Sequence, residues 1–315
     1  MLARTLAISS VLLLLCSTGK TTPLPQTSFD SVSIEGRWDI TLDMNGKTAP
    51  SWLEVRHSGK HTLVGDWVST GGSARPIAEV HYNGDKLHFS IPPQWEDGAG
   101  DLVVEGEVQG DGLRGTVSFP DGKKFNWTGE RAPKLKRNKT PAWGSPIRLF
   151  NGRDLAGWHA MGANQWKAEN GILFSPKSGS NLVTDERFTD FKLHIEFRYP
   201  KESNSGVYLR GRYEVQVMDS TGGEPWVGGL GAVYGFIVPS EEVAKEAGTW
   251  QSYDITLIGR MVTVVANSKT IICNREIPGI TGGALDSKEG EPGPIYLQGD
   301  HGPIEYRNIV LTPAR

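Results

Sequence analysis

Residues 203–219, with the sequence SNSGVYLRGRYEVQVMD, alternate polar and apolar side chains in a way that predicts extended backbone. Tyr208, Arg210, Arg212, Glu214 and Gln216 fall on one face, because successive side chains of a strand point to opposite faces. These residue types form directional hydrogen bonds with hydroxyl and carbonyl groups. The pattern is therefore typical of a strand that lines a site for a polar ligand.

Two further segments carry polar side chains on one face, residues 191–199 (FKLHIEFRY) and residues 295–301 (IYLQGDH). Their polar members are His194, Glu196 and Arg198 in the first, and Tyr296 and Gln298 in the second, which then bends at Gly299 through Asp300 and His301. Alternating Glu and Arg on exposed strands also form cross-strand pairs that face water and contribute only about 0.2–1 kcal/mol each. A solvated surface therefore stays open as the alternative for each residue.

The composition of the chain favours strands and gives no sign of a nucleic-acid partner. Its 315 residues allow two domains of ordinary size, and its net charge is −3. The 39 glycines and 10 tryptophans suit short strands and tight turns better than helices. An all-β fold is therefore expected.

The N-terminal residues have the pattern of an export signal. Arg4 precedes an apolar run over residues 7–15, which is too short to span a membrane and is followed by polar residues. We expect residues 1–19 to be a signal peptide and the protein to be periplasmic or secreted, with lipidation of Cys16 as an alternative. Once this segment is removed, Cys273 is the single cysteine of the mature chain, and we expect it to be a buried thiol rather than a nucleophile.

Residues 33–131 predict an N-terminal β-barrel. Eight short alternating segments are separated by turns such as HSGKH, YNGDK, QGDGL and PDGKK. This order of consecutive strands is typical of an up-and-down barrel, and the opening Gly36-Arg37-Trp38 resembles that of lipocalin-like barrels. Trp38, Trp52, Trp67 and Trp95 either line a ligand cavity or fill the barrel interior. Residues 132–146 are basic and contain prolines, which predicts a linker.

Residues 147–315 predict a second all-β domain. Long alternating strands with little helix favour two packed antiparallel sheets. The only helix that we expect covers residues 240–248, SEEVAKEAG, where Ser240 is placed as the N-cap and Gly248 as the stop.

Several ordered motifs of this half resemble the 3-keto-disaccharide hydrolase family, also described as 3-keto-glucoside 1,2-lyase/hydratase. They are LFNGRDLAGWH, SNSGVYLRGRYEVQVMD, GAVYG, GTWQSYDITLIGRMVTVVANSKTI and YLQGDHGPIEYRNI, within residues 147–313. The resemblance does not reach the barrel. It implies a concanavalin A-like jelly-roll sandwich that binds carbohydrate on its concave sheet. One departure is Asn267-Ser268-Lys269, where an Asn-Gly turn is more usual.

The chemistry that the resemblance implies is cleavage of a sugar oxidised at carbon 3. A base removes the acidic proton at carbon 2, the enolate expels the group at carbon 1, and water can add. On residue type and strand parity we assign Glu214 or Glu196 as base, Arg210 to the enolate oxygen, and His301 as acid or proton shuttle. The expected substrate-binding residues are Asn204, Tyr208, Gln216, Asp219, Trp226, Gln298 and Asp300.

No cofactor is expected, because the chain contains no dinucleotide fingerprint or phosphate-binding glycine loop. A separate oxidoreductase would then supply the 3-keto sugar. A divalent metal held by His194, Glu196, Glu214 and His301 is the less favoured alternative, since no local ligand spacing supports it.

Two other functions stay open at this stage. The first is a retaining glycoside hydrolase that uses Glu214 and Asp219, although their parity places them on opposite faces unless a bulge intervenes. The second is a non-catalytic carbohydrate-binding protein that uses Tyr208, Arg210 and Trp226. The sequence does not identify the sugar, the aglycone or the oligomeric state.

Overall fold

The computed structural model describes residues 33–315, which are almost entirely strands and loops. The expected signal peptide and Cys16 lie outside these residues. The described part of the chain holds no helix long and apolar enough to cross a membrane.

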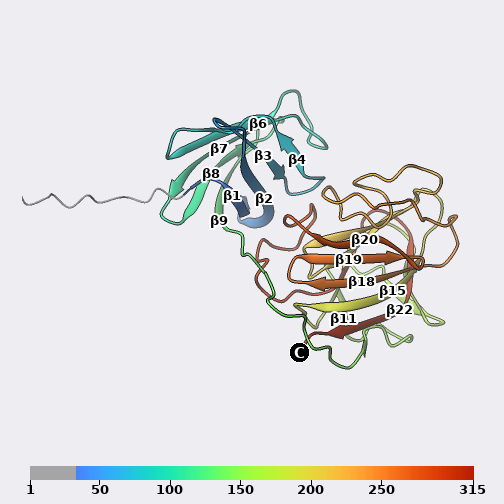
Figure 1. Cartoon of the computed structure of the whole chain (residues 1–315). Coiled ribbons are helices and arrows are strands. Elements are labelled where there is room, and N and C mark those ends of the chain that lie inside the picture. Colours follow the sequence, from blue (N-terminus) through green and yellow to red (C-terminus); the bar gives the residue numbers. More distant parts are fainter. Residues whose placement is uncertain (1–32) are drawn as a thin grey trace, which may run out of the picture. The chain divides into compact units, whose positions relative to one another are not determined.

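Residues 36–131 form one curled antiparallel sheet of nine strands, in the order β4-β3-β2-β1-β9-β8-β7-β6-β5 (Figure 1). The strands that come first and last in the sequence of this half, β1 and β9, pair with each other. Strands β4 and β5 form the two edges of the sheet, and no ladder between them is found in the described residues. The strands are β1 (Gly36–Met44), β2 (Lys47–Ser58), β3 (Thr62–Val68), β4 (Arg75–Ile77), β5 (His81–Tyr82), β6 (Lys86–Ile91), β7 (Leu102–Gln109), β8 (Gly112–Ser118) and β9 (Lys124–Arg131).

The all-β, barrel-like fold of this half is thus confirmed, with one strand more than the eight expected. The segment expected as a single fourth strand is divided into β4 and β5, because the backbone leaves the ladder after Ile77. At the break, the N–H of Val80 donates to the Leu63 carbonyl, 2.7 Å away, and its side chain turns into the core. The interior is filled by side chains that include the buried rings of Trp38, Trp67 and Trp127.

The second half is a sandwich of two antiparallel sheets. The larger has the order β12-β13-β22-β15-β18-β19-β20, with β10 also paired to β22, and the smaller has the order β11-β14-β21-β16-β17. Strands of the larger sheet are β10 (Ile147–Arg148), β12 (Lys167–Glu169), β13 (Ile172–Ser175), β15 (Phe191–Arg198), β18 (Gln251–Ile258), β19 (Met261–Ala266), β20 (Lys269–Glu276) and β22 (Ile304–Pro313). Those of the smaller sheet are β11 (Trp158–Ala160), β14 (Leu182–Thr184), β16 (Asn204–Leu209), β17 (Tyr213–Met218) and β21 (Tyr296–Leu297).

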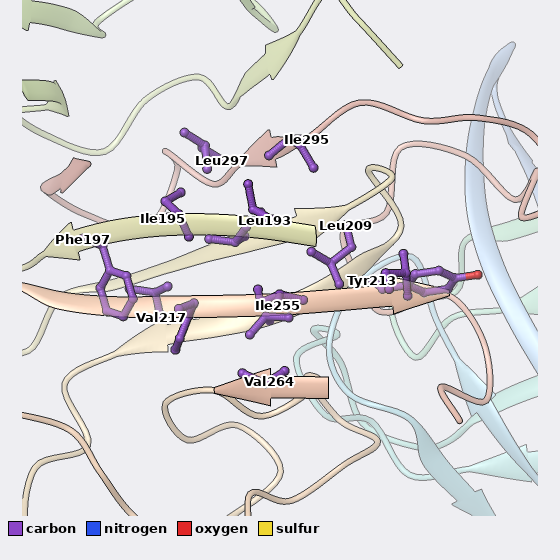
Figure 2. Packing of buried hydrophobic residues seen from close by; sticks show 14 of the residues in the cluster. Leu193, Ile195, Phe197, Leu209, Tyr213, Val217, Ile255, Val264, Ile295 and Leu297 are labelled. Carbon is purple, nitrogen blue, oxygen red and sulfur yellow. The ribbon is translucent and has the colours of Figure 1, made fainter. Parts of the chain in front are cut away.

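The core of the sandwich lies between the two sheets. Figure 2 shows Leu193, Ile195 and Phe197 of β15 close to Leu209 and Val217 of the smaller sheet. Burial of each such side chain contributes about 1.5–3 kcal/mol. Because the apolar residues of β16 and β17 face this core, their alternate residues face the outer surface of the smaller sheet.

The helix expected over residues 240–248 is wrong, since the segment is a loop. Its backbone groups bond to side chains and strands instead of to one another. Asn267 Nδ2 donates to the Val243 carbonyl at 2.9 Å, and the Gly248 N–H donates to the backbone carbonyl of Tyr199 at 2.8 Å. The buried thiol expected for Cys273 is also wrong. Irregular pairing of β20 with β19 buries Ile271 and Ile272 in succession and leaves Cys273 exposed.

The curled sheet and the sandwich belong to one compact unit, residues 32–315. Trp52 of β2 is buried in the core of the sandwich, where its ring meets Phe236 edge-on at 5.3 Å. Part of the expected linker is docked on the sandwich, because Arg137 donates to Asp190 at 2.6 Å.

Candidate active site

A cavity of about 400 Å³ opens on the outer face of β16, β17 and β21. This volume lies within the range of small-molecule sites, about 300–1,000 Å³. Strand residues from the smaller sheet and several loops contribute polar side chains. The lining residues are Gly71, Gly72, Gln94, Trp95, Asn204, Tyr208, Glu214, Gln216, Tyr234, Gly282, Gly283, Tyr296, Gln298, Asp300 and His301.

Glu214 is the most deeply buried acid of this cavity, with only 3% of its surface exposed. Strand β17 places it beside Gly206 of β16, and the absence of a side chain on Gly206 makes room for the carboxyl group. Burial raises the pKa of Glu214 to about 8, against the lowering effects of the Tyr208 hydroxyl and the charge of His301. A carboxyl group with this pKa is mainly protonated at neutral pH.

Tyr208 links Glu214 to the neighbouring loop. Its hydroxyl lies 2.9 Å from Glu214 Oε2 and 2.9 Å from the carbonyl oxygen of Gly282. The ring stacks on Tyr296 with centroids 4.2 Å apart and planes 10° from parallel. Burial raises the pKa of Tyr208 well above its usual range, so the phenol keeps its proton.

His301 and Asp300 form a second titratable pair in the cavity. His301 Nδ1 lies 2.5 Å from Asp300 Oδ1, and Asn181 Nδ2 donates to the other carboxylate oxygen at 3.3 Å. The hydrogen bond to Asp300 raises the pKa of His301, although partial burial opposes the shift. Burial alone would raise the pKa of Asp300, but the hydrogen bonds and charge of its neighbours lower it.

Amide side chains supply the remaining polar groups. Asn204 Oδ1 and Gln298 Oε1 are buried without a hydrogen-bond partner in the described part of the chain. Unpaired buried polar atoms cost about 1–3 kcal/mol each. Both residues line the cavity, so a bound ligand with hydroxyl groups would satisfy them.

The cavity brings together Asn204, Tyr208, Glu214, Gln216, Gln298, Asp300 and His301 of the residues expected from the sequence. Glu196, expected as an alternative base, lies elsewhere. It is on β15 of the larger sheet, where it accepts hydrogen bonds from Arg307 at 2.6 Å and Asn308 at 2.8 Å. The cross-strand pair left open as the alternative is therefore what the structure shows for this residue.

Arg210 also lies outside the cavity, contrary to its expected place beside Tyr208. It occupies the turn between β16 and β17 with φ of 54°, which breaks the alternation of side chains. Its buried guanidinium donates to Tyr213 and to the carbonyl of Gly259, both at 2.9 Å. Arg212, placed on the same face by parity, instead donates to Asp286 at 2.6 Å.

Asp219 and Trp226 are the other two expected residues that do not line the cavity. Asp219 follows β17 and accepts hydrogen bonds from the Glu202 N–H and the Thr221 hydroxyl, each at 3.1 Å. Trp226 is 50% exposed and packs over Gly228 and Gly229 within its own loop. The pairing of Glu214 with Asp219 proposed for a retaining glycosidase is therefore absent from the cavity.

The expected metal set is also divided between the sheets. His194, on β15, pairs with Asp254 across the larger sheet at 2.7 Å, far in topology from Glu214 and His301. Within residues 33–315, no group of three or more His, Cys, Asp or Glu side chains has a metal-binding arrangement.

Four of the lining residues come from the N-terminal sheet, and sequence reasoning did not place them in this site. They are Gly71, Gly72, Gln94 and Trp95. Trp95 is one of the four tryptophans for which the sequence leaves open a place in a cavity of the barrel itself. The other three are buried, whereas Trp95 is 48% exposed. The QWEDGAG loop around it is polar and glycine-rich, which was the available signal for a surface position.

Comparison with known proteins identifies the C-terminal half. A family model described as a 3-keto-alpha-glucoside-1,2-lyase-like domain matches residues 145–312. No curated protein matches the chain. A solved structure from Parabacteroides distasonis, described as a "putative glycosyl hydrolase", is 27% identical and covers 57% of this chain and 96% of its own, with a TM-score of 0.47. Another from the same organism, with the same description, is 23% identical and covers 53% and 98%, with a TM-score of 0.43.

Proposed function

The chain belongs to the 3-keto-alpha-glucoside-1,2-lyase-like domain family of carbohydrate-active enzymes, and we propose that it cleaves 3-keto-glycosides by elimination. One observation carries the proposal. A buried carboxyl group, Glu214, shares a cavity with the paired imidazole of His301. Two groups with differently tuned proton affinities are what an elimination requires of its acid and base.

The reaction has three balanced steps. A ketone at C3 makes the proton at C2 acidic, and a base removes it while the electrons pass to the C3 oxygen as an enolate. The enolate then re-forms the ketone as a C1–C2 double bond forms and the C1–O bond breaks. The leaving oxygen takes a proton from an acid. Addition of water across the double bond would complete the hydrolysis and give the free 3-keto sugar.

His301 is the proposed base. Asp300 occupies its Nδ1, which leaves Nε2 for the substrate and orients the ring. The raised pKa of His301 makes the neutral ring a stronger base at the C2 proton. This role replaces the acid or shuttle role that residue type alone suggested.

Glu214 is the proposed acid at the leaving oxygen. The hydroxyl of Tyr208 has one proton but lies 2.9 Å from two oxygens, Glu214 Oε2 and the Gly282 carbonyl. The carbonyl can only accept, so both hydrogen bonds form at once only when Glu214 is protonated and donates to Tyr208. The pKa of about 8 agrees with this proton count and favours Glu214 as acid over its expected role as base.

Neutral hydrogen-bond donors are proposed to stabilise the enolate oxygen. The described lining residues include no arginine or lysine, so the role assigned to Arg210 passes to amide groups. Asn204, Gln216 and Gln298 are the candidates, and their amides would also bind sugar hydroxyls. A separate oxidoreductase is proposed to supply the ketone.

Exchange at C2 separates the two roles experimentally. Purified protein is incubated in D₂O with 3-keto-glucosides that carry either a methoxy or a nitrophenoxy leaving group. We expect His301→Ala to lose both deuterium exchange and cleavage. Glu214→Gln should keep exchange and the nitrophenoxy cleavage, because this leaving group needs no acid, but lose methoxy cleavage at least a hundredfold.

The same assay tests the rival functions. Cleavage of the plain glucoside at a rate similar to that of its 3-keto counterpart would support a glycoside hydrolase. Binding without exchange or cleavage of any substrate would support a carbohydrate-binding protein. Loss of exchange in Glu214→Gln alone would reverse the assignment of acid and base.

A further inference from the structure

Trp95 presents an exposed aromatic surface to the cavity from a part of the chain that the family match does not cover. It follows β6 of the N-terminal sheet, whereas the match begins at residue 145. Its side chain is 48% exposed, while Trp38, Trp52 and Trp67 are fully buried. An indole left open to solvent within a polar cavity is a suitable surface for the apolar face of a sugar ring.

The loop that carries Trp95 is held rigid by a buried ion pair. Glu96 accepts from Arg75 at 2.8 and 3.2 Å, and the two side chains are only 2% and 10% exposed. Glu96 Oε2 also accepts the backbone N–H groups of Gln94 at 2.9 Å and Trp95 at 3.2 Å. Removing two charges from water is costly, so this pair orders the loop at the expense of desolvation. A binding site needs side chains that are held in place, and this rigid loop holds Trp95 in that way.

The ring itself is also held in place. It meets Phe119 edge-on with centroids 6.5 Å apart and lies over Gly71 and Gly72. A Cβ atom on Gly72 would approach the indole to 2.8 Å, and the φ of this residue is 76°, so glycine is needed there. The Gln94 side chain binds Ser73 through a hydrogen bond from the Ser73 N–H at 2.9 Å and one to its hydroxyl at 2.6 Å.

This loop system joins the segment that contacts the proposed acid. A Cβ atom on Gly282 would lie 2.2 Å from the carbonyl oxygen of Gly72, so the two backbones touch only because Gly282 lacks a side chain. The Gly282 carbonyl in turn lies 2.9 Å from the hydroxyl of Tyr208, the partner of Glu214. The tryptophan platform is therefore fixed relative to the groups that act on the leaving oxygen.

We propose that Trp95 forms a subsite for a second ring, the sugar or aryl group attached through the C1 oxygen of the 3-keto sugar. This inference rests on the proposed function. The 3-keto sugar ring that reacts needs the amides and the titratable groups of the smaller sheet. The indole of Trp95 is therefore available to the ring of the leaving group. The N-terminal sheet thereby selects substrates with a ring as leaving group over those with a small alkyl group.

The test compares two substrates and three proteins. We expect Trp95→Ala to lower kcat/KM about tenfold for a 3-keto-glucosyl-glucose disaccharide, the loss typical of one aromatic contact. Activity on the methyl 3-keto-glucoside should be unchanged, and Trp95→Phe should recover part of the loss. Trp226→Ala is the matched control, because this ring is equally exposed but lies outside the cavity, and it should behave as the wild type.

An equal kcat/KM of wild type and Trp95→Ala on the disaccharide would overturn the subsite while the proposed function stands. If the wild type cleaves neither substrate, the proposed function fails, and calorimetric binding of the unoxidised disaccharide then decides the subsite. About tenfold weaker binding by Trp95→Ala supports it. Equal affinity, or no binding by either protein, overturns it.

Discussion

Gly206 gives Glu214 the space for its carboxyl group: a Cβ atom on Gly206 would lie 2.3 Å from Glu214 Oε1 and 2.9 Å from its Cγ. The two residues are on neighbouring strands, β16 and β17, and share the face that lines the cavity. The backbone of Gly206 also accepts the N–H of Gln298 at 2.9 Å. A strand glycine that is not in a turn is thus tied to the position of the proposed acid.

Gly206→Ala should displace the carboxyl group without unfolding the protein. We expect cleavage of the methoxy substrate to fall at least tenfold. Exchange at C2 should continue, because the proposed base His301 and its partner Asp300 are unchanged. Overpacking of this buried site should cost about 1–3 kcal/mol, so thermal unfolding should stay cooperative but move to a lower temperature. Gly290→Ala is the control, because a Cβ there would meet only Pro133, at an ordinary 3.7 Å. If Gly206→Ala cleaved the methoxy substrate at the wild-type rate, the exact position of the Glu214 carboxyl group would not be critical for cleavage.

Asp300→Asn should alter the pH profile as well as the rate. Asp300 raises the pKa of His301, so its neutralisation should bring that pKa down. A base with a lower pKa loses its proton at lower pH, so the acidic limb of kcat/KM for exchange should move to lower pH. The rate on the plateau should fall about tenfold or more, because the base is weaker and its ring is less well oriented.

The alkaline limb reports Glu214, whose pKa is raised mainly by burial and least by the charge of Asp300, so Asp300→Asn should move this limb less than the acidic limb. Cleavage of a poor leaving group needs protonated Glu214, so it should decline above about pH 8 in the wild type and at a slightly lower pH in Asp300→Asn. An unshifted acidic limb in Asp300→Asn would show that His301 is not the titrating base.

Strand alternation was enough to predict the part of the candidate site that lies on β16 and β17. Tyr208, Glu214 and Gln216 share a face because they lie on regular backbone in β16 and β17. The same rule failed for Arg210, because its left-handed φ of 54° in the turn resets the direction of its side chain. Parity within one strand also says nothing about which sheet the strand joins, and Glu196 faces outward from the other sheet.

The contribution of Trp95 depends on contacts that alternation cannot supply. Its ring packs against Gly72, and the backbone of Gly72 closely approaches that of Gly282, from which it is separated by most of the chain. Similarly, the expected helix over residues 240–248 had suitable caps, but hydrogen bonds from residues such as Asn267 hold that segment as a loop. Local propensity predicted the all-β class, and long-range contacts decided these exceptions.

Glu96→Gln tests whether the buried ion pair positions the Trp95 loop. Arg75 would keep its charge in a buried site without a matching carboxylate, which costs about 3–5 kcal/mol of stability. We expect a lower melting temperature and the same loss of disaccharide selectivity as in Trp95→Ala, with unchanged kcat/KM on the methyl glycoside. Glu105→Gln is the control, since its pair with Lys124 is exposed and 3.4 Å long. A destabilised Glu96→Gln with full disaccharide activity would contradict the positioning role.

Asp39 should make the stability of the protein fall as the pH rises. It is buried where the two halves meet, and burial, with the nearby charge of Glu289, raises its pKa to about 9 despite Arg260 and Arg212. An aspartate with a raised folded pKa contributes full stability below its unfolded value of about 4, and loses it progressively as the pH rises towards 9. Asp39→Asn removes this titration, which costs the wild type about 1.4 kcal/mol for each pH unit above 4. We therefore expect the free energy of unfolding of the variant to exceed that of the wild type by up to about 5 kcal/mol at pH 8, and the difference to vanish near pH 4. Urea unfolding at both pH values measures the effect, with Asp111→Asn as the exposed control on the same sheet. A wild-type stability that rises between pH 4 and pH 8, with no gain from Asp39→Asn, would show that this carboxyl group is ionised without cost in the folded protein.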